Sequence, residues 1–356
     1  MLFFHTKQLS LYANIEKFMR QYYPFINVAR FIAIFLVIVG HVTKNEFLFN
    51  AIFSFHMPLF FILSGLLFTP GVKLGTLAAK KFKSLIVPYF FFYLLTLAYF
   101  WAVEAHFRES HVASEWMRLL PLLLGNNYAS GMSHNIVLWF LPTLFCIEIA
   151  SNIIYNRLHS DWGRITIVLA IGAIGFALAK LEIWELPWGI SQAMVMLPFY
   201  FVGIYGKGLL TALSQRKAPC IIVFILSAIT FIYLTTIIGK NAVQPGLFPS
   251  IPLFVLSSLV GSLLTVSASI LIGSRPWLEA LGAGSVTLVV MALHEPLYRP
   301  LIIIAGKLAH TDARASVALT LGVAVVTFVL CYFASVLYNR YVASRLNSMI
   351  KKDKNR

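Results

Sequence analysis

The chain has 356 residues, of which 59% are hydrophobic and only 12% are charged, and its mean hydropathy is +0.82. Soluble domains carry about 25% charged residues, so this composition excludes an ordinary soluble protein and is typical of a polytopic membrane protein. The formal net charge is +15. Whether this basic excess indicates a nucleic-acid partner depends on where the Lys and Arg residues lie.

Ten apolar segments are long enough to cross a bilayer, and no cleavable signal precedes the first. The sequence therefore predicts an all-α integral membrane protein: an N-terminal segment over 1–27, one membrane domain over 28–339 and a basic tail over 340–356. The predicted transmembrane helices lie near 28–44, 47–68, 84–104, 135–155, 164–181, 192–211, 219–239, 250–273, 285–306 and 316–339.

The basic residues are unevenly distributed between the two sides of this predicted topology. Most of the 28 Lys and Arg residues fall in the segments that share a side with the two ends of the chain. By the positive-inside rule, this side is cytoplasmic, so both termini are predicted to be cytoplasmic. Loops at an anionic lipid surface account for the basic excess, and we therefore expect no nucleic-acid partner.

The first predicted span carries Arg30 near its start and His41 near its end. Their spacing is close to three helical turns, so both side chains lie on one face, about 16 Å apart along the axis. Ionisable groups at membrane depth usually face a protein or water-filled interior, which makes this pair a candidate functional site. The alternative is that both are end residues that reach toward the membrane surfaces.

The second span contains His56, Pro58 and the pair Ser64–Gly65. A proline within a span kinks the helix and frees a carbonyl, which is tolerable where that carbonyl faces protein or a cavity. The Ser64–Gly65 pair is either part of a cavity wall or a packing face of small residues.

The longest loop, roughly 105–134, is predicted on the outer side and contains His106, His111 and His134. It is too short for a separate domain. It is long enough to cover a pocket as a lid or re-entrant element, although an ordinary solvated loop explains it equally well.

Later spans carry further polar residues at membrane depth. Trp139 opens the fourth span as an interfacial anchor or a cavity-lining residue, and Glu148 lies deeper, as a buried partner for a cation or a polar packing residue. In the ninth span, Glu295 and Arg299 have the i,i+4 spacing of a local ion pair. That pairing leaves His294, near the bilayer midplane, unexplained.

Five sequence blocks occur in a fixed order. They are the R-x10-H of residues 30–41, FHMPLFFILSG at 55–65, WFLPTLF at 139–145, LPFYFVGI at 197–204, and the segment 282–297 that ends in LHEPL. Together they resemble the membrane-bound acyltransferase-3 family, which includes bacterial sugar O-acetyltransferases, from about residue 25 to 305. One departure is Phe31, which stands where the family commonly has a glycine after the arginine.

The resemblance implies an O-acyltransferase in the bacterial inner membrane. It implies transfer of an acyl group, by default acetyl, from cytoplasmic acyl-CoA to a sugar hydroxyl of a surface polysaccharide or its lipid-linked precursor. Acyl-CoA is then a co-substrate, with no permanently bound cofactor, and the other partners are the glycan and membrane lipids. A transporter or flippase of a glycan, with Arg30, His41 and His294 lining its path, is the rival interpretation.

The residue chemistry fits acyl transfer independently of the resemblance. Histidine has a pKa suited to deprotonating a hydroxyl, and the arginine fork is suited to phosphate. We therefore predict His41 as general base or transient acyl carrier, Arg30 as donor-binding, and His294 as a second catalytic-site group; no metal is expected. The remaining candidates for the cavity wall or its support are His56, Ser64, Trp139, Glu148, Ser285, Glu295 and Arg299.

Overall fold

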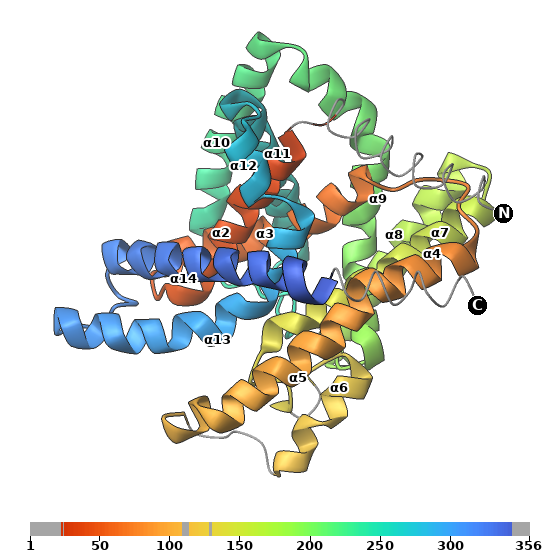
Figure 1. Cartoon of the computed structure of the whole chain (residues 1–356). Helices are drawn as coiled ribbons and strands as arrows, with labels where there is room; N and C mark the ends of the chain where they lie inside the picture. Colours follow the sequence, from red (N-terminus) through yellow and green to blue (C-terminus); the bar gives the residue numbers. More distant parts are fainter. Residues whose placement is uncertain (1–22, 24, 109–113, 128–129, 344–356) are drawn as a thin grey trace.

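The computed structural model describes residues 23, 25–108, 114–127 and 130–343 (Figure 1). Within these residues the chain is helical, apart from one isolated β-bridge, and ten helices are long and apolar enough to cross a membrane. The predicted fold class and number of spans are confirmed. Nearly all of the predicted N-terminal segment and most of the basic tail lie outside the described residues, as does His111.

The ten spanning helices begin and end within a few residues of the predicted segments. They are α2 (Phe25–Val42), α3 (Glu46–Leu66), α5 (Val87–Ala102), α7 (Phe140–Arg157), α8 (Asp161–Lys180), α9 (Ile190–Ser214), α10 (Lys217–Ile237), α11 (Ile251–Ile272), α13 (Gly284–Ala309) and α14 (Val317–Tyr338). Shorter helical elements are α4 (Leu74–Lys81), η1 (Phe82–Ile86), η2 (Glu104–His106), η3 (Glu115–Arg118), α6 (Leu120–Leu124), η5 (Ile136–Trp139), η6 (Pro187–Gly189), α12 (Pro276–Leu281) and η7 (Asn339–Ala343).

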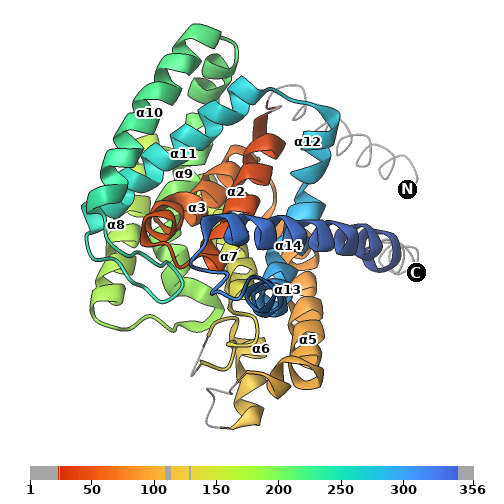
Figure 2. The same ribbon diagram turned by 90° about the vertical axis from the view of Figure 1, so that its left-hand side faces the viewer.

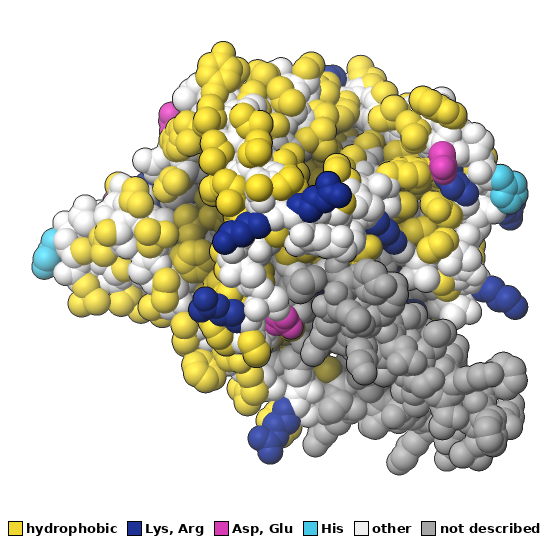
Figure 3. All heavy atoms as spheres, turned by 90° about the horizontal axis from the view of Figure 1, so that it is seen from above, with side chains coloured by type: hydrophobic (Ala, Val, Ile, Leu, Met, Phe, Trp, Pro, Cys, Tyr) yellow, Lys and Arg dark blue, Asp and Glu magenta, His cyan; other side chains and the backbone are white. Residues whose placement is uncertain are grey.

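Helices α2 and α3 lie in the middle of the bundle (Figure 2). Helices α8 to α11 lie on one side of them, and α13 with α14 lies on the other. The outward faces are apolar: α8 and α10 expose large side chains such as Leu169 and Leu226, and hydrophobic side chains cover much of the upper part of the view in Figure 3. A helix that is apolar all round is typical of a membrane span, so these faces suit contact with lipid.

The Ser64–Gly65 pair lies where α3 contacts α9. A Cβ on Gly65 would lie 1.9 Å from the carbonyl oxygen of Tyr200, so only glycine permits this approach of the two backbones. The Ser64 hydroxyl donates to the carbonyl of Phe60 in its own helix, at 2.8 Å. The structure therefore favours the packing role for this pair.

Pro58 leaves the carbonyl of Ser54 without its helical donor, because proline has no backbone N–H. The hydroxyl of Ser258 on α11 donates to this carbonyl at 2.8 Å. The freed carbonyl thus faces protein, as predicted, and its hydrogen bond joins α3 to α11.

The described part of the long loop is fastened to α5. The Tyr89 hydroxyl donates to the carbonyl of Pro121 at 2.6 Å, and the Tyr93 hydroxyl donates to the carbonyl of Arg118. The Arg118 side chain is fully buried and lies over the ring of Phe100. An ordinary solvated loop does not bury an arginine, so this segment is part of the packed structure.

Candidate active site

A cavity of about 470 Å³ lies between α2, α3, η5, α7 and α13 and reaches the turn that connects α10 to α11. Its wall is largely apolar, but Arg30, His41, His56, Trp139 and His294 all contribute to it. Arg30 and His41 therefore share one face of α2, as their spacing predicted. Trp139 is buried in this wall, which excludes the role of interfacial anchor.

The three cavity histidines share one hydrogen-bonding arrangement. In each, Nδ1 lies 2.7–3.0 Å from the carbonyl oxygen four residues earlier in its own helix: Val37 for His41, Ile52 for His56 and Val290 for His294. A carbonyl only accepts, so Nδ1 carries the hydrogen in each neutral ring. The second nitrogen, Nε2, then has a free lone pair and can accept a proton.

His41 on α2 and His294 on α13 contact each other edge to face in the cavity wall. Their ring centroids are 5.1 Å apart, with the planes at 80°. The centroid of the Phe53 ring lies 5.3 Å from that of His41 and 4.9 Å from that of His56, so this ring contacts both histidines. His294 is fully buried, and its Nε2 has no hydrogen-bond partner in the described part of the chain. Such a nitrogen is a candidate base, because burying it unpaired is otherwise costly.

Arg30 lies about three helical turns from His41, and this spacing is about 16 Å along α2. Its Nη1 donates to the side chain of Asn27 at 3.4 Å, and no carboxylate within the described ranges forms an ion pair with it. A cavity-lining guanidinium without a carboxylate partner is available for an anion such as phosphate. Among the described residues, no group of three or more His, Cys, Asp or Glu is placed to hold a metal ion.

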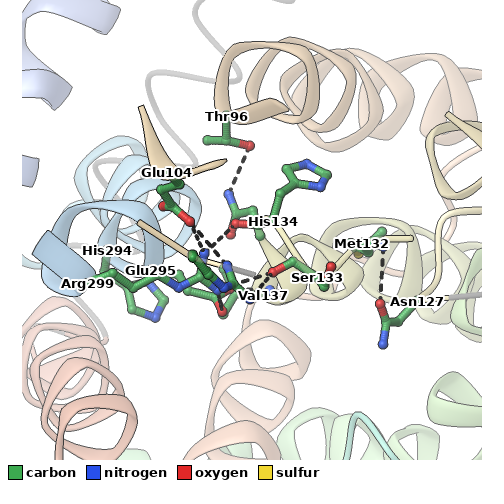
Figure 4. Close-up of polar contacts among 12 residues, drawn as sticks. Thr96, Glu104, Asn127, Met132, Ser133, His134, Val137, His294, Glu295 and Arg299 are labelled. Carbon is green, nitrogen blue, oxygen red and sulfur yellow. Dashed lines mark hydrogen bonds and ion pairs between the residues drawn. The ribbon is translucent and has the colours of Figure 1, made fainter. Parts of the chain in front are cut away.

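A buried ion network holds the end of the long loop against α13 beside His294 (Figure 4). The Arg299 guanidinium pairs with Glu295, as predicted, and also donates to Glu104 at 3.0 Å and to the carbonyl of His134 at 2.7 Å. The backbone N–H of Val137 donates to the second Glu295 oxygen at 3.3 Å. Val137 lines the cavity, so Glu295 and Arg299 position part of its wall from behind.

Asn135 completes this attachment. Pro296 cannot donate to the carbonyl of Ala292, and the Asn135 amide takes its place at 2.8 Å while also donating to Thr96 at 3.3 Å. This contact lies within one turn of His294, so it fixes the kink of α13 at the candidate site.

The other predicted site residues lie away from the cavity wall. Glu148 pairs with Lys81 and is buried, so the structure favours its role as partner for a cation. Ser285 is exposed at the start of α13. Ser64 belongs to the packing face described above.

Sequence reasoning missed three residues that build the site: Glu104, Asn135 and Gln244. Glu104 is the last residue of the predicted span 84–104, and the structure shows it fully buried. Asn135 and Gln244 line or support the cavity through contacts with residues more than 30 positions away. The proline at position 296 signals that Ala292 needs a donor, but no local pattern identifies Asn135 as that donor.

The comparison with protein families decides the class. The family model for the acyltransferase domain of the acyltransferase-3 family matches residues 23–336. The chain belongs to this family. The match extends from the start of α2 almost to the end of α14, and the protein is thus a multi-pass membrane acyltransferase. No curated protein and no solved structure matches the chain.

Proposed function

We propose that this acyltransferase-3 protein moves an acetyl group from cytoplasmic acetyl-CoA to a sugar hydroxyl on the outer side of the bacterial inner membrane. The acceptor is a surface polysaccharide or its lipid-linked precursor. One observation carries the proposal: a single cavity holds, at one end of α2, an arginine that pairs with no carboxylate of the described residues and, at the other end, two histidines in contact. The positive-inside distribution of Lys and Arg supports an orientation with the Arg30 end toward the cytoplasm.

The dimensions of the cavity suit an acyl-CoA arm. Three bonds of an extended chain span roughly 3.6 Å, so the about twelve bonds between the CoA phosphate and its sulfur span roughly 14 Å. The Arg30–His41 spacing along α2 is about 16 Å. Arg30 would hold the phosphate by charge-assisted hydrogen bonds, and the apolar wall would enclose the arm, with the thioester beside His41.

In the direct mechanism, Nε2 of His41 takes the proton of the acceptor hydroxyl while its oxygen attacks the thioester carbonyl. The C–S bond breaks, and the CoA thiolate takes the proton from the imidazolium. In the alternative, Nε2 of His41 attacks the thioester first, the C–S bond breaks, and CoA leaves as the thiolate. The acceptor oxygen then attacks the acyl-histidine, its proton passes to Nε2 of His294, and the bond between His41 and the acyl group breaks. A burst of CoA release without acceptor distinguishes the second mechanism. His294 is thus the base that deprotonates the acceptor in the alternative, whereas in the direct mechanism it is a neighbouring wall group beside His41.

The proposal is tested by base-labile O-acetyl on envelope glycans, measured by NMR in wild type, a deletion strain, and deletion strains that carry His41→Ala or the surface control Ser285→Ala. We expect the acetyl signal to be lost in the deletion, restored by Ser285→Ala, and absent with His41→Ala at matched protein level. If His41→Ala restores the acetyl signal, His41 is neither the general base nor the acyl carrier. Unchanged acetylation in the deletion strain would rule out this class of acceptor.

A further inference from the structure

The turn between α10 and α11 has a fixed shape. Ala242 and Leu247 form a two-bond antiparallel bridge, with N···O distances of 3.0 and 2.9 Å. Gly246 has φ +73°, and a Cβ there would lie 2.7 Å from the Trp184 ring. Any other residue at position 246 is therefore both strained and blocked. The bridge and the glycine thus fix the two ends of the turn around residues 243–245.

Within this turn, the backbone of Gln244 is clamped by two buried side chains. The Trp184 indole donates to the Gln244 carbonyl at 2.6 Å, and the Gln192 amide donates to the same oxygen at 3.0 Å. Trp184 is 6% exposed and Gln192 is 2% exposed. Two buried donors on one carbonyl of a surface turn hold that residue far more firmly than a solvated loop requires.

Gln244 itself lines the cavity that contains His41 and His294. Within the described ranges its side-chain amide forms no hydrogen bond, although its backbone carbonyl takes two. The turn follows the end of α10, which lies on the same membrane side as the His41 end of α2 because six further spans separate the two ends. A cavity-lining residue with a fixed backbone, whose side-chain amide has no partner among the described residues, thus lies at the histidine end of a mostly apolar cavity.

An amide offers both a donor and an acceptor, which matches a sugar hydroxyl, and it carries no charge that would favour an ion instead. Trp139 lines the same cavity and provides an apolar ring surface. Ligand-binding cavities with mostly apolar walls orient their ligand through a small number of polar groups. We propose that Gln244 is an acceptor-binding residue: its amide hydrogen-bonds a hydroxyl of the sugar adjacent to the hydroxyl that is acylated. The inference rests on the proposed function and assigns the turn 242–247 to acceptor recognition.

The test uses the purified full chain in lipid nanodiscs, with acetyl-CoA as donor and glycans extracted from the deletion strain as acceptor. Gln244→Ala should raise the KM for the glycan by roughly three- to tenfold, the effect of one lost hydrogen bond, with the KM for acetyl-CoA unchanged. Trp184→Phe keeps the ring over Gly246 but removes the indole N–H, so it should change the glycan KM in the same direction.

Leu247→Ala is the matched control, because this exposed residue lies in the same turn but does not line the cavity. It should leave both KM values unchanged. An unchanged glycan KM for Gln244→Ala would overturn the inference alone, as would an equal loss for donor and glycan, which would indicate general collapse of the wall. A wild-type protein that consumes no acetyl-CoA would overturn the proposed function together with the inference.

Discussion

Replacing Asn135 by alanine should destabilise the protein through a single carbonyl oxygen. The Asn135 amide is the donor, at 2.8 Å, to the carbonyl of Ala292, which Pro296 leaves without its helical partner. A buried carbonyl without a donor costs about 1–3 kcal/mol, and hydrogen bonds between membrane helices contribute up to about 1.7 kcal/mol. We therefore expect Asn135→Ala to lower the free energy of unfolding by about 1–2 kcal/mol.

The same reasoning predicts a rescue. Pro296→Ala restores a backbone N–H that can donate to Ala292, so in this background Asn135→Ala loses only the weaker 3.3 Å contact to Thr96, about 0.5 kcal/mol. The coupling free energy of the double-mutant cycle should be roughly 1 kcal/mol.

The measurement is thermal unfolding of the four proteins in detergent. A loss of 1 kcal/mol corresponds to a fall in Tm of about 2–4 °C for chains of a few hundred residues. If Asn135→Ala lowers Tm equally in the wild-type protein and in the Pro296→Ala variant, the account of the freed carbonyl is refuted. An effect of Pro296→Ala alone does not disturb this test, because the test compares only the fall in Tm that Asn135→Ala causes in each of the two backgrounds.

Three further outcomes follow from the buried ionisable groups. Arg299→Leu should destabilise the protein by about 3–5 kcal/mol, because the buried carboxylates of Glu104 and Glu295 lose a positive charge that pairs with them. Arg299→Lys keeps that charge and should destabilise the protein less. Urea unfolding measures the free energy of unfolding of both variants. Lys81→Met should lower Tm more than the double change Lys81→Met with Glu148→Gln, and equal Tm values would contradict the buried pair. Burial, reinforced by the nearby Arg118, lowers the pKa of His134 to about 3. The unfolded chain, with a histidine pKa near 6.5, binds this proton first, so stability should fall by about 1.4 kcal/mol per pH unit between about pH 6.5 and pH 3. His134→Phe should make Tm depend less on pH between pH 7 and pH 5. A pH dependence of Tm equal to that of the wild-type protein would contradict this role of His134.

The spans were predictable because the bilayer constrains each of them locally. A helix that crosses hydrocarbon needs about 20 apolar residues and satisfies its own backbone, so hydropathy alone located the ten helices to within a few residues. The same local regularity placed Arg30 and His41 on one face of α2, since their separation is close to a whole number of turns.

The rest of the site depends on contacts that no local period encodes. Asn135 reaches Ala292, and Trp184 reaches Gln244, across 157 and 60 positions of the chain. Glu104 ends the predicted span 84–104, and nothing local in the sequence indicates that the folded bundle pairs it with Arg299. Contacts between a loop and a helix arise from tertiary packing, which a single sequence does not reveal. The sequence indicates only which group needs a partner, such as the Ala292 carbonyl that Pro296 leaves without a donor.

The measurement that tests the central claim most directly is acetyl transfer by the purified full chain in nanodiscs, with acetyl-CoA and glycans from the deletion strain, for wild type and His41→Ala. Removal of a general base or nucleophile lowers kcat by about 10²- to 10⁴-fold. The account predicts such a loss in His41→Ala, with Tm unchanged to within a few degrees and with Ser285→Ala fully active. A His41→Ala protein that transfers acetyl at the wild-type rate would contradict it.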